Sequence, residues 1–138
     1  MSDSNNIPSS FPSSDSEWKE KLDLDSYHVM RKQGTERPFS GKYNDYYEDG
    51  SYYCKGCKTE LFLANSKFNG HCGWPSFDAE KNDAGIKKIM DKSHGMIRTE
   101  IVCGKCDSHL GHLFTDGPTE TGYRYCVNSV SLIHEKDL

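Results

Sequence analysis

Cysteine is the residue type of this chain with the most chemistry available to it, and its six copies fall into two kinds. Four form two C-x-x-C pairs, in YCKGC and VCGKC, while two stand alone, in HCGWPSF and RYCVNS. Four paired thiolates suit one tetrahedral metal ion, whereas lone cysteines in unusual surroundings suit redox chemistry. The spacing therefore predicts that the structural and the reactive sulfurs are separate.

The paired cysteines predict a structural zinc site. Each C-x-x-C turn can present two thiolates to one side of the ion, and two such turns complete a closed shell that leaves no position for catalysis. Because a long stretch of chain separates the pairs, the metal would join distant hairpins and stabilise the fold. A thioredoxin-like redox pair is disfavoured, since neither pair lies at a strand-to-helix junction of a βαβ unit. The expected ligands are Cys54, Cys57, Cys103 and Cys106.

The neighbours of Cys126 favour a reactive thiol. Arg124, two residues earlier, would favour the thiolate, and Asn128, two residues later, would share its face of a strand. His109 and His112 in HLGH could donate or relay protons. The spacing alone leaves open a Cys/His active site, structural histidines, an alternative zinc ligand, or a cysteine that is simply a small buried hydrophobe.

Cys72 lies between Gly70 and Gly73, which indicate a flexible loop. A mobile cysteine near a nucleophilic one is what a resolving thiol requires, because it must stay apart during the first step and reach over in the second. Trp74 and Phe77, which follow in GWPSF, could form an apolar wall. They could equally be ordinary core aromatics.

Length and composition set the frame in which these residues must be positioned. With 138 residues the chain predicts one domain, over residues 15–138, after a Ser-, Asn- and Pro-rich tail, residues 1–14, that is expected to be disordered. The net charge of −4 argues against nucleic-acid binding, and no apolar run is long enough to span a membrane. Because the tail lacks a secretory or mitochondrial pattern, the expected location is the cytoplasm, or also the nucleus.

Two short helices are expected near the N-terminus. Ser14 can cap the first, with Glu17 three residues later completing a capping box. The second is expected to be capped by Asp25 or Ser26 and ended by Gly34. The remainder reads as short strands and turns, so the predicted fold class is mainly β, or α+β, with the helices packed on an antiparallel sheet.

The strand region carries one turn signal and one segment that is hard to assign. Asp49-Gly50 is typical of a hairpin turn. Residues 81–95 are polar and predict a loop that covers part of the sheet. The predicted strands are residues 59–63, 67–70, 97–103, 109–117 and 123–133.

The chain resembles the methionine sulfoxide reductase B family in four motifs that occur in order: GTERPFSGKY, YCKGC, KFNGHCGWPSF and SHGMIRTEIVCGKCDSHLGHLFTDGPTETGYRYCVNS. The similarity runs from about Trp18 to about Leu132. It implies a β-tent of two antiparallel sheets with short N-terminal helices and a structural zinc. It also implies reduction of methionine-R-sulfoxide, free or within proteins, with thioredoxin as the reductant and no organic cofactor.

The resemblance assigns roles to the candidate residues. Cys126 is the implied nucleophile, which becomes a sulfenic acid, and Cys72 is the implied resolving cysteine, which closes an intramolecular disulfide. His112, with His109 assisting, would deliver a proton to the sulfoxide oxygen. The implied zinc ligands are the four paired cysteines.

The same resemblance outlines a substrate pocket. The indole of Trp74 would face the methyl group of the substrate, and Arg124, Asn128 and the two histidines would line the polar side. Phe77 remains a candidate for the apolar wall. His71 departs from the family pattern, because glycine is more usual beside the resolving cysteine.

Two other classes of protein compete with an enzyme. A non-enzymatic zinc-binding β-tent that binds partners would need the C-x-x-C turns but not Cys126, Cys72 and the histidines. A zinc-ribbon nucleic-acid binder would need a basic stripe, which this acidic chain lacks. The preferred interpretation is therefore a monomeric oxidoreductase that acts on oxidised methionine of a protein or peptide.

Overall fold

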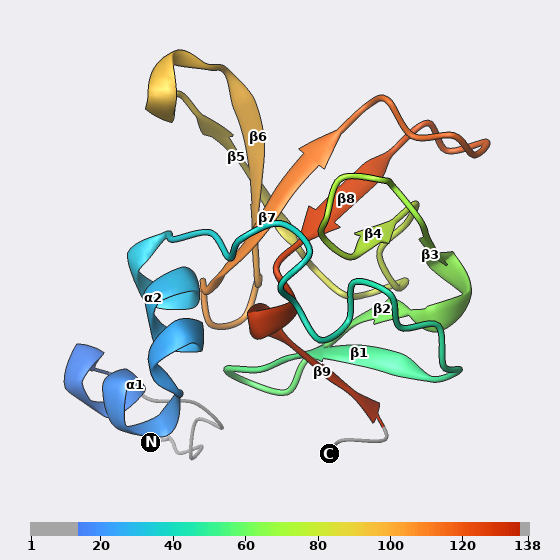
Figure 1. Ribbon diagram of the computed structural model, residues 1–138. Coiled ribbons are helices and arrows are strands. Elements are labelled where there is room, and N and C mark those ends of the chain that lie inside the picture. The colour runs from blue at the N-terminus through green and yellow to red at the C-terminus, as the bar shows by residue number, and fades with distance from the viewer. Residues whose placement is uncertain (1–13, 136–138) are drawn as a thin grey trace.

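The structure, a computed structural model, describes residues 14–135 as short helices followed by strands in two antiparallel sheets (Figure 1). The helices are α1 (Asp15–Lys21) and α2 (Leu24–Lys32). The strands are β1 (Ser51–Cys54), β2 (Glu60–Leu63), β3 (Lys67–Phe68), β4 (Ser76–Phe77), β5 (Lys87–Asp91), β6 (Arg98–Val102), β7 (His109–Phe114), β8 (Arg124–Val127) and β9 (Leu132–His134). The smaller sheet has the order β2-β1-β9, and the larger sheet has the order β3-β4-β8-β7-β6-β5.

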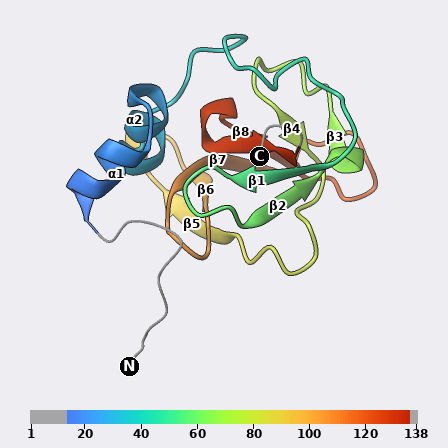
Figure 2. The same ribbon diagram turned by 90° about the horizontal axis from the view of Figure 1, so that it is seen from below.

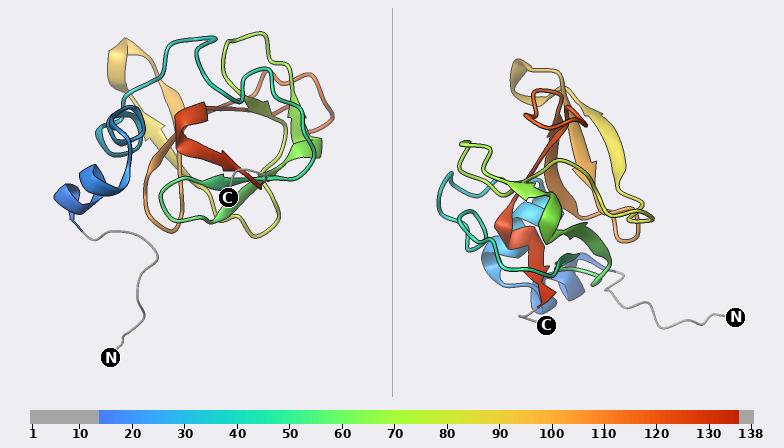
Figure 3. Two further views of the ribbon diagram at one scale, coloured as in Figure 1. Left: turned by 60° about the horizontal axis from the view of Figure 1, so that its bottom comes forward. Right: turned by 90° about the vertical axis from the view of Figure 1, so that its right-hand side faces the viewer.

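The arrangement confirms the predicted β-tent of two antiparallel sheets with short N-terminal helices. β1, β2 and β9 lie together at one end of the domain, and the hairpin of β5 and β6 stands out from the opposite end (Figures 1 and 3). Seen from below, α1 and α2 lie side by side at one edge of the sheets (Figure 2). Neither helix within residues 14–135 has the length and apolar character needed to cross a membrane.

Side-chain caps start both helices. Ser14 caps α1 as predicted, because its Oγ accepts the backbone N–H of Glu17. For α2 the predicted caps, Asp25 and Ser26, were wrong, because the carboxylate of Asp23 accepts the N–H of Ser26 and starts the helix earlier. Apart from Ser14, the predicted tail lies outside the described residues.

The end of α2 depends on two adjacent residues. Gln33 adopts the left-handed φ of 57°, so it, and not Gly34, takes the conformation that terminates the helix. Gly34 then donates its N–H to the carbonyl of His28 at 3.0 Å. A Cβ at Gly34 would lie 2.3 Å from the His28 ring, which explains why a glycine follows this helix.

The strand predictions failed where a strand is exposed. Residues 81–95, expected to be a loop, contain β5, and every residue of β5 pairs with β6. Four of its five residues are exposed, so the strand lacks the alternation of apolar and polar residues that a half-buried strand shows. The hairpin expected at Asp49-Gly50 is also absent, because β1 pairs with β2 and β9 instead.

The last predicted strand, residues 123–133, is divided in the structure. β8 belongs to the larger sheet and β9 to the smaller one, and a short 3-10 turn over Ser129–Ser131 separates them. Asn128 precedes this turn, so it lies where the chain passes from one sheet to the other.

Aromatic side chains fill the core where the two sheets meet. Phe62 of the smaller sheet stacks on Phe77 of the larger one, with ring centroids 4.2 Å apart. Tyr52 and Tyr125 contact the same pair edge-on. Because all four are buried, this contact fixes the position of one sheet on the other.

Candidate active site and metal centre

The four paired cysteines lie in two turns of the same design. The first turn joins β1 to β2, and in it the N–H of Cys54 donates to the carbonyl of Thr59 at 2.8 Å. The N–H of Lys58 donates back to the carbonyl of Cys54, also at 2.8 Å, and Lys58 has a left-handed φ of 67°. The Sγ of Cys57 lies 3.0 Å from the Thr59 hydroxyl.

The second turn joins β6 to β7 and repeats each contact. The N–H of Cys103 donates to the carbonyl of Ser108, and the N–H of Asp107 donates to the carbonyl of Cys103, both at 2.9 Å. Asp107 has a φ of 61°, and the Sγ of Cys106 lies 3.1 Å from the Ser108 hydroxyl. The backbone of each turn is therefore fixed by its own hydrogen bonds.

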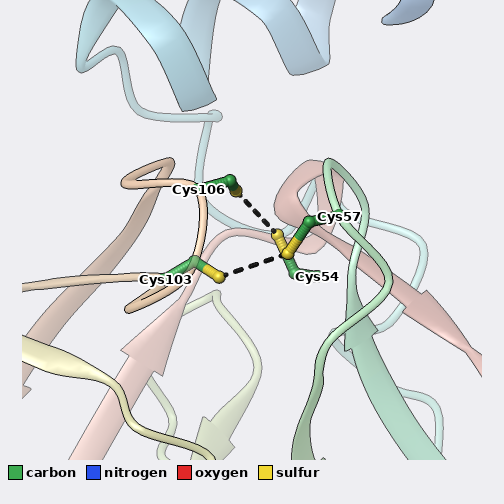
Figure 4. Close-up of side chains that lie close together, drawn as sticks. All are labelled: Cys54, Cys57, Cys103 and Cys106. Atoms are coloured by element: carbon green, nitrogen blue, oxygen red, sulfur yellow. Dashed lines mark hydrogen bonds between the residues drawn. The ribbon is translucent and has the colours of Figure 1, made fainter. Parts of the chain in front are cut away.

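The two turns bring all four sulfurs together (Figure 4). The Sγ atoms lie within 4.8 Å of one another, with Cys54 3.7 Å from Cys106 and Cys57 3.5 Å from Cys103. Four thiolates at about 2.3 Å from one zinc ion would lie roughly 3.8 Å apart, so the spacing fits tetrahedral coordination. Hydrogen bonding to Cys103 already lowers the pKa of Cys57. This buried cluster could hold a metal ion.

The N-terminal helices pack on the two cysteine turns. Arg31 of α2 donates to the carbonyl of Cys106 at 2.8 Å and to the hydroxyl of Ser108 at 2.9 Å. Its guanidinium lies 4.4 Å from the ring centroid of Trp18. The Trp18 ring lies so close to Gly56 of the first turn that a Cβ there would be 2.9 Å away. The two helices thus contact both turns at once.

Strand register gathers the reactive residues on one face of the larger sheet. Cys126 of β8 lies opposite Ser76 of β4 and opposite His112 of β7, and His112 lies opposite Glu100 of β6. Residues opposite each other in antiparallel strands project to the same face. Phe77 follows Ser76 and projects to the other face, so this candidate for the substrate wall lies in the core.

The two lone cysteines contact each other. The Sγ of Cys72 lies 3.5 Å from the Sγ of Cys126, although a resolving cysteine was expected to be held apart at first. The Cys72 loop is joined to a second loop, because the N–H of Phe39 donates to the carbonyl of Gly73 at 2.7 Å. His71 has a left-handed φ of 56°, the conformation in which glycine is least strained.

The contact between the two sulfurs shifts the pKa values of the two thiols in opposite directions. Their hydrogen bond lowers the pKa of Cys72 to about 5 and raises the pKa of Cys126 far above its usual range, because one proton is shared between them. Burial raises both values, and the positive charge of Arg124 lowers both. Arg124 thus acts in the predicted direction, because its charge favours the thiolate of Cys126.

Each candidate histidine is hydrogen-bonded to a carboxylate. The Nε2 of His112 lies 2.8 Å from Asp91 Oδ2, and the Nδ1 of His109 lies 2.7 Å from Glu100 Oε2. The two rings meet edge to face, with centroids 5.6 Å apart. Burial lowers the pKa of His109, and Glu100 opposes that shift. His112 lies opposite Cys126 and is therefore the histidine better placed to donate a proton there.

A small pocket of about 80 Å³ lies over Cys126. Its volume suits a group the size of a few water molecules, such as the end of one side chain. Trp74 and Phe114 supply apolar surface, and His112 and Arg98 supply polar groups. The lining residues are Thr35, Trp74, Arg98, Gly111, His112, Phe114, Cys126, Val127 and Asn128.

Asn128 and Trp74 meet through the backbone of Glu36. The Oδ1 of Asn128 accepts the N–H of Glu36 at 3.0 Å, and its Nδ2 donates to the carbonyl of Leu110 at 3.0 Å. The indole N–H of Trp74 donates to the carbonyl of Glu36, also at 3.0 Å. Asn128 therefore fixes the segment that orients the indole.

Arg124 lies beside the pocket rather than in its lining. Its Nε donates to Asp116 Oδ1 at 2.9 Å, and its guanidinium lies 4.3 Å from the ring centroid of Phe114. The sequence reasoning missed Phe114, which lies two residues after His112 and could have been found from the strand period of two. It also missed Asp91, because that residue lies in the segment interpreted as a loop.

A closed cluster of four thiols, with a separate pair of contacting thiols at a pocket, defines a thiol-dependent oxidoreductase with an independent structural centre. Residues 22–136 match the SelR domain family. The chain is 57% identical to the peptide methionine sulfoxide reductase MsrB of Pseudomonas savastanoi pv. phaseolicola, over 84% of this chain and 88% of that protein. The MsrB proteins of Pseudomonas fluorescens and Pseudomonas putida strain GB-1 are 57% and 56% identical over 84% of this chain, covering 89% and 88% of their own lengths. This chain belongs to the SelR domain family, and within it to the peptide methionine sulfoxide reductases of the MsrB type.

Proposed function

We propose that this chain reduces methionine-R-sulfoxide, free or within proteins, through thiol chemistry at Cys126. The observation that carries the proposal is the position of Cys126 at a pocket lined by Trp74 and His112, with the Sγ of Cys72 at 3.5 Å. The names of the similar MsrB proteins support the same substrate class. The proposed catalytic domain is residues 15–138, and the proposed oligomeric state is a monomer.

In the first step, the thiolate of Cys126 attacks the sulfoxide sulfur while His112 delivers a proton to the sulfoxide oxygen. The oxygen passes to Cys126, which is oxidised to a sulfenic acid, and methionine leaves, reduced by two electrons. Asp91 orients the His112 ring through their 2.8 Å hydrogen bond. His109 assists from its edge-to-face contact with His112.

In the second step, the thiolate of Cys72 attacks the sulfenic sulfur of Cys126. The S–O bond breaks, the hydroxide takes up a proton and leaves as water, and a disulfide remains. A disulfide bond is about 2.05 Å long, so the sulfurs need to approach by only about 1.5 Å from their present distance. Thioredoxin would reduce the disulfide by thiol exchange, which suits the reducing conditions of the cytoplasm.

The pocket also supports a preference for one configuration at sulfur. With the substrate methyl group against Trp74 and the oxygen toward His112, a space of about 80 Å³ would leave the remaining substituent to extend out of the pocket. Asn128 contributes by fixing the backbone that accepts the Trp74 indole N–H. Inverting the sulfur would exchange the methyl group and the oxygen, placing the polar atom on the indole.

Zinc is the metal proposed for the four-cysteine cluster, on the basis of its donor set and sulfur spacing. When bound by Cys54, Cys57, Cys103 and Cys106, it would supply a structural cross-link between the two turns. Because the shell is complete with protein thiolates, no reaction step passes through it.

The test is incubation of the purified protein with separate R and S diastereomers of methionine sulfoxide and with dithiothreitol, followed by quantification of methionine. Conversion of the R form alone is expected. Equal conversion of both forms would contradict the proposed pocket orientation. Inactivity toward both would favour a zinc-binding interaction module instead. If the R form is reduced, a second assay replaces dithiothreitol with thioredoxin and its reductase to test recycling.

A further inference from the structure

Ser76 contacts the resolving cysteine and lies opposite the attacking one in the sheet, although the reaction outlined above gives it no role. It is fully buried on β4, directly opposite Cys126, and its Oγ lies 3.5 Å from the Sγ of Cys72. The same hydroxyl donates to the carbonyl of Trp74 at 3.2 Å. Ser76 is thus a polar side chain within reach of both the resolving sulfur and the segment that carries it.

A serine hydroxyl has one proton to donate, so its two contacts compete. When Cys72 is a thiol, its S–H can donate to the Trp74 carbonyl, 3.5 Å away, or to the Ser76 oxygen. When Cys72 is a thiolate it can only accept, and the stronger bond from Ser76 is then the one to the charged sulfur. The hydroxyl of Ser76 therefore responds to the charge on Cys72.

The contact matters most after the first step of the reaction. In the resting pair the two Sγ atoms lie 3.5 Å apart, so a Cys126 S–H can also donate to a Cys72 thiolate, and Arg124 of the same strand contributes its positive charge. Once Cys126 carries oxygen it has lost its S–H. Among the side chains that contact Cys72 in the described structure, Ser76 is then the donor that the reaction has left unchanged.

We propose that Ser76 is a positioning residue for disulfide formation: its hydroxyl donates to the Cys72 thiolate and holds that sulfur against the Cys126 sulfenic acid. The proposal rests on the proposed function. The step balances as attack of the Cys72 thiolate on the Cys126 sulfur, cleavage of the S–O bond, and loss of the hydroxide as water after it takes up one proton.

A purely structural role for Ser76 predicts different results. The hydroxyl also fits tightly against Gly70, where a Cβ would lie 2.4 Å from the Ser76 Oγ. A residue that only shapes this loop would affect both reaction steps together. A donor to the Cys72 thiolate affects the second step and the titration of Cys72.

The first experiment measures the titration without any turnover. In a Cys126→Ser background, thiolate absorbance near 240 nm reports Cys72, with a Cys72→Ser/Cys126→Ser variant as the blank. Adding Ser76→Ala should raise the pH midpoint of Cys72 thiolate formation by about one pH unit, since a hydrogen bond to the charged sulfur is lost. An unchanged midpoint would overturn the proposal, and this readout remains valid even if the chain reduces no sulfoxide.

The second experiment separates the two reaction steps with otherwise native cysteines and no reductant. Ser76→Ala should release the first methionine at the native rate, while disulfide formation, followed by mass spectrometry of quenched samples, should slow by about tenfold. Equal slowing of both steps, or of neither, would contradict the role. If the native protein releases no methionine, the proposed function fails instead.

Two further variants control for the loss of any buried hydroxyl and for a Ser76→Ala protein that does not fold. Ser26→Ala removes another fully buried serine hydroxyl, which donates to the carbonyl of Val130 at 2.7 Å, and should alter neither step. Gly70→Ala keeps Ser76 but places a methyl group against its hydroxyl. It should reproduce the shifted Cys72 titration even if Ser76→Ala does not fold; a native titration in Gly70→Ala would count against the proposal.

Discussion

The molecule contains two groups of sulfur atoms at similar spacing but in different settings. In the four-cysteine cluster, neighbouring Sγ atoms lie 3.5 and 3.7 Å apart, and in the Cys72–Cys126 pair they lie 3.5 Å apart. The cluster is buried on two matched turns that are fixed by their own backbone hydrogen bonds. The pair is half-buried, with one sulfur on a strand and the other on a loop.

This comparison shows that distance alone does not decide what a sulfur does. Four thiolates that complete the coordination shell of one metal ion leave no open position, so none of them is available as a nucleophile. The pair has a pocket beside it and a histidine opposite it, so its thiols remain available to react. Substitutions in each group of sulfurs test this difference, and they follow in decreasing order of expected effect.

The largest effect is expected from Cys126→Ser. Without the attacking sulfur no sulfenic acid can form, so sulfoxide reduction should fall to background, while metal content and thermal unfolding stay close to native. Methionine release with dithiothreitol and metal analysis on the same sample check both. Retained turnover would refute Cys126 as the nucleophile.

Cys72→Ser should stop the cycle one step later. Sulfenic acid forms before resolution, so about one methionine per enzyme should appear, and thioredoxin should drive no further turnover. A burst measurement with and without thioredoxin and its reductase distinguishes the two steps. Multiple thioredoxin-driven turnovers would show that another thiol resolves.

Cys103→Ser should affect the other group of sulfurs. Removing one ligand opens the cluster, so bound zinc should be lost, and the free energy of unfolding should fall by about 4 kcal/mol or more. Loss of stability should precede loss of chemistry. Elemental analysis and denaturant unfolding test this, and unchanged metal content would refute the four-cysteine site.

A smaller effect is expected from Arg31→Met, which keeps a long side chain near Trp18 but removes two hydrogen bonds to the second turn. Stability should fall by about 1–3 kcal/mol, and zinc should pass faster to a coloured chelator. Lys32→Met, at the next residue of α2, is the matched control, because Lys32 is exposed. Equal zinc-transfer rates in the two variants would mean that Arg31 does not support the cluster.

The element predictions included one that a local interaction confirms and one that failed because the strand depends on a distant partner. The cap at Ser14 was found because a capping serine acts on its own segment. The strand β5 was missed because its exposed residues show no alternation, and it forms through hydrogen bonds to β6. Since Asp91 lies on β5, the partner of His112 could not be predicted either.

The amino-acid sequence was enough to show which cysteines form pairs along the chain, and the motifs around them indicated the family. C-x-x-C spacing is a local property, so two turns able to hold a metal ion could be predicted from composition and spacing alone. The resemblance already implied that Cys72 reaches Cys126, but the folded arrangement was needed to show that the two sulfurs are in contact from the start and that Phe77 belongs to the core. Those placements depend on which strands pair and in which register, and register is set by contacts between residues far apart in the chain.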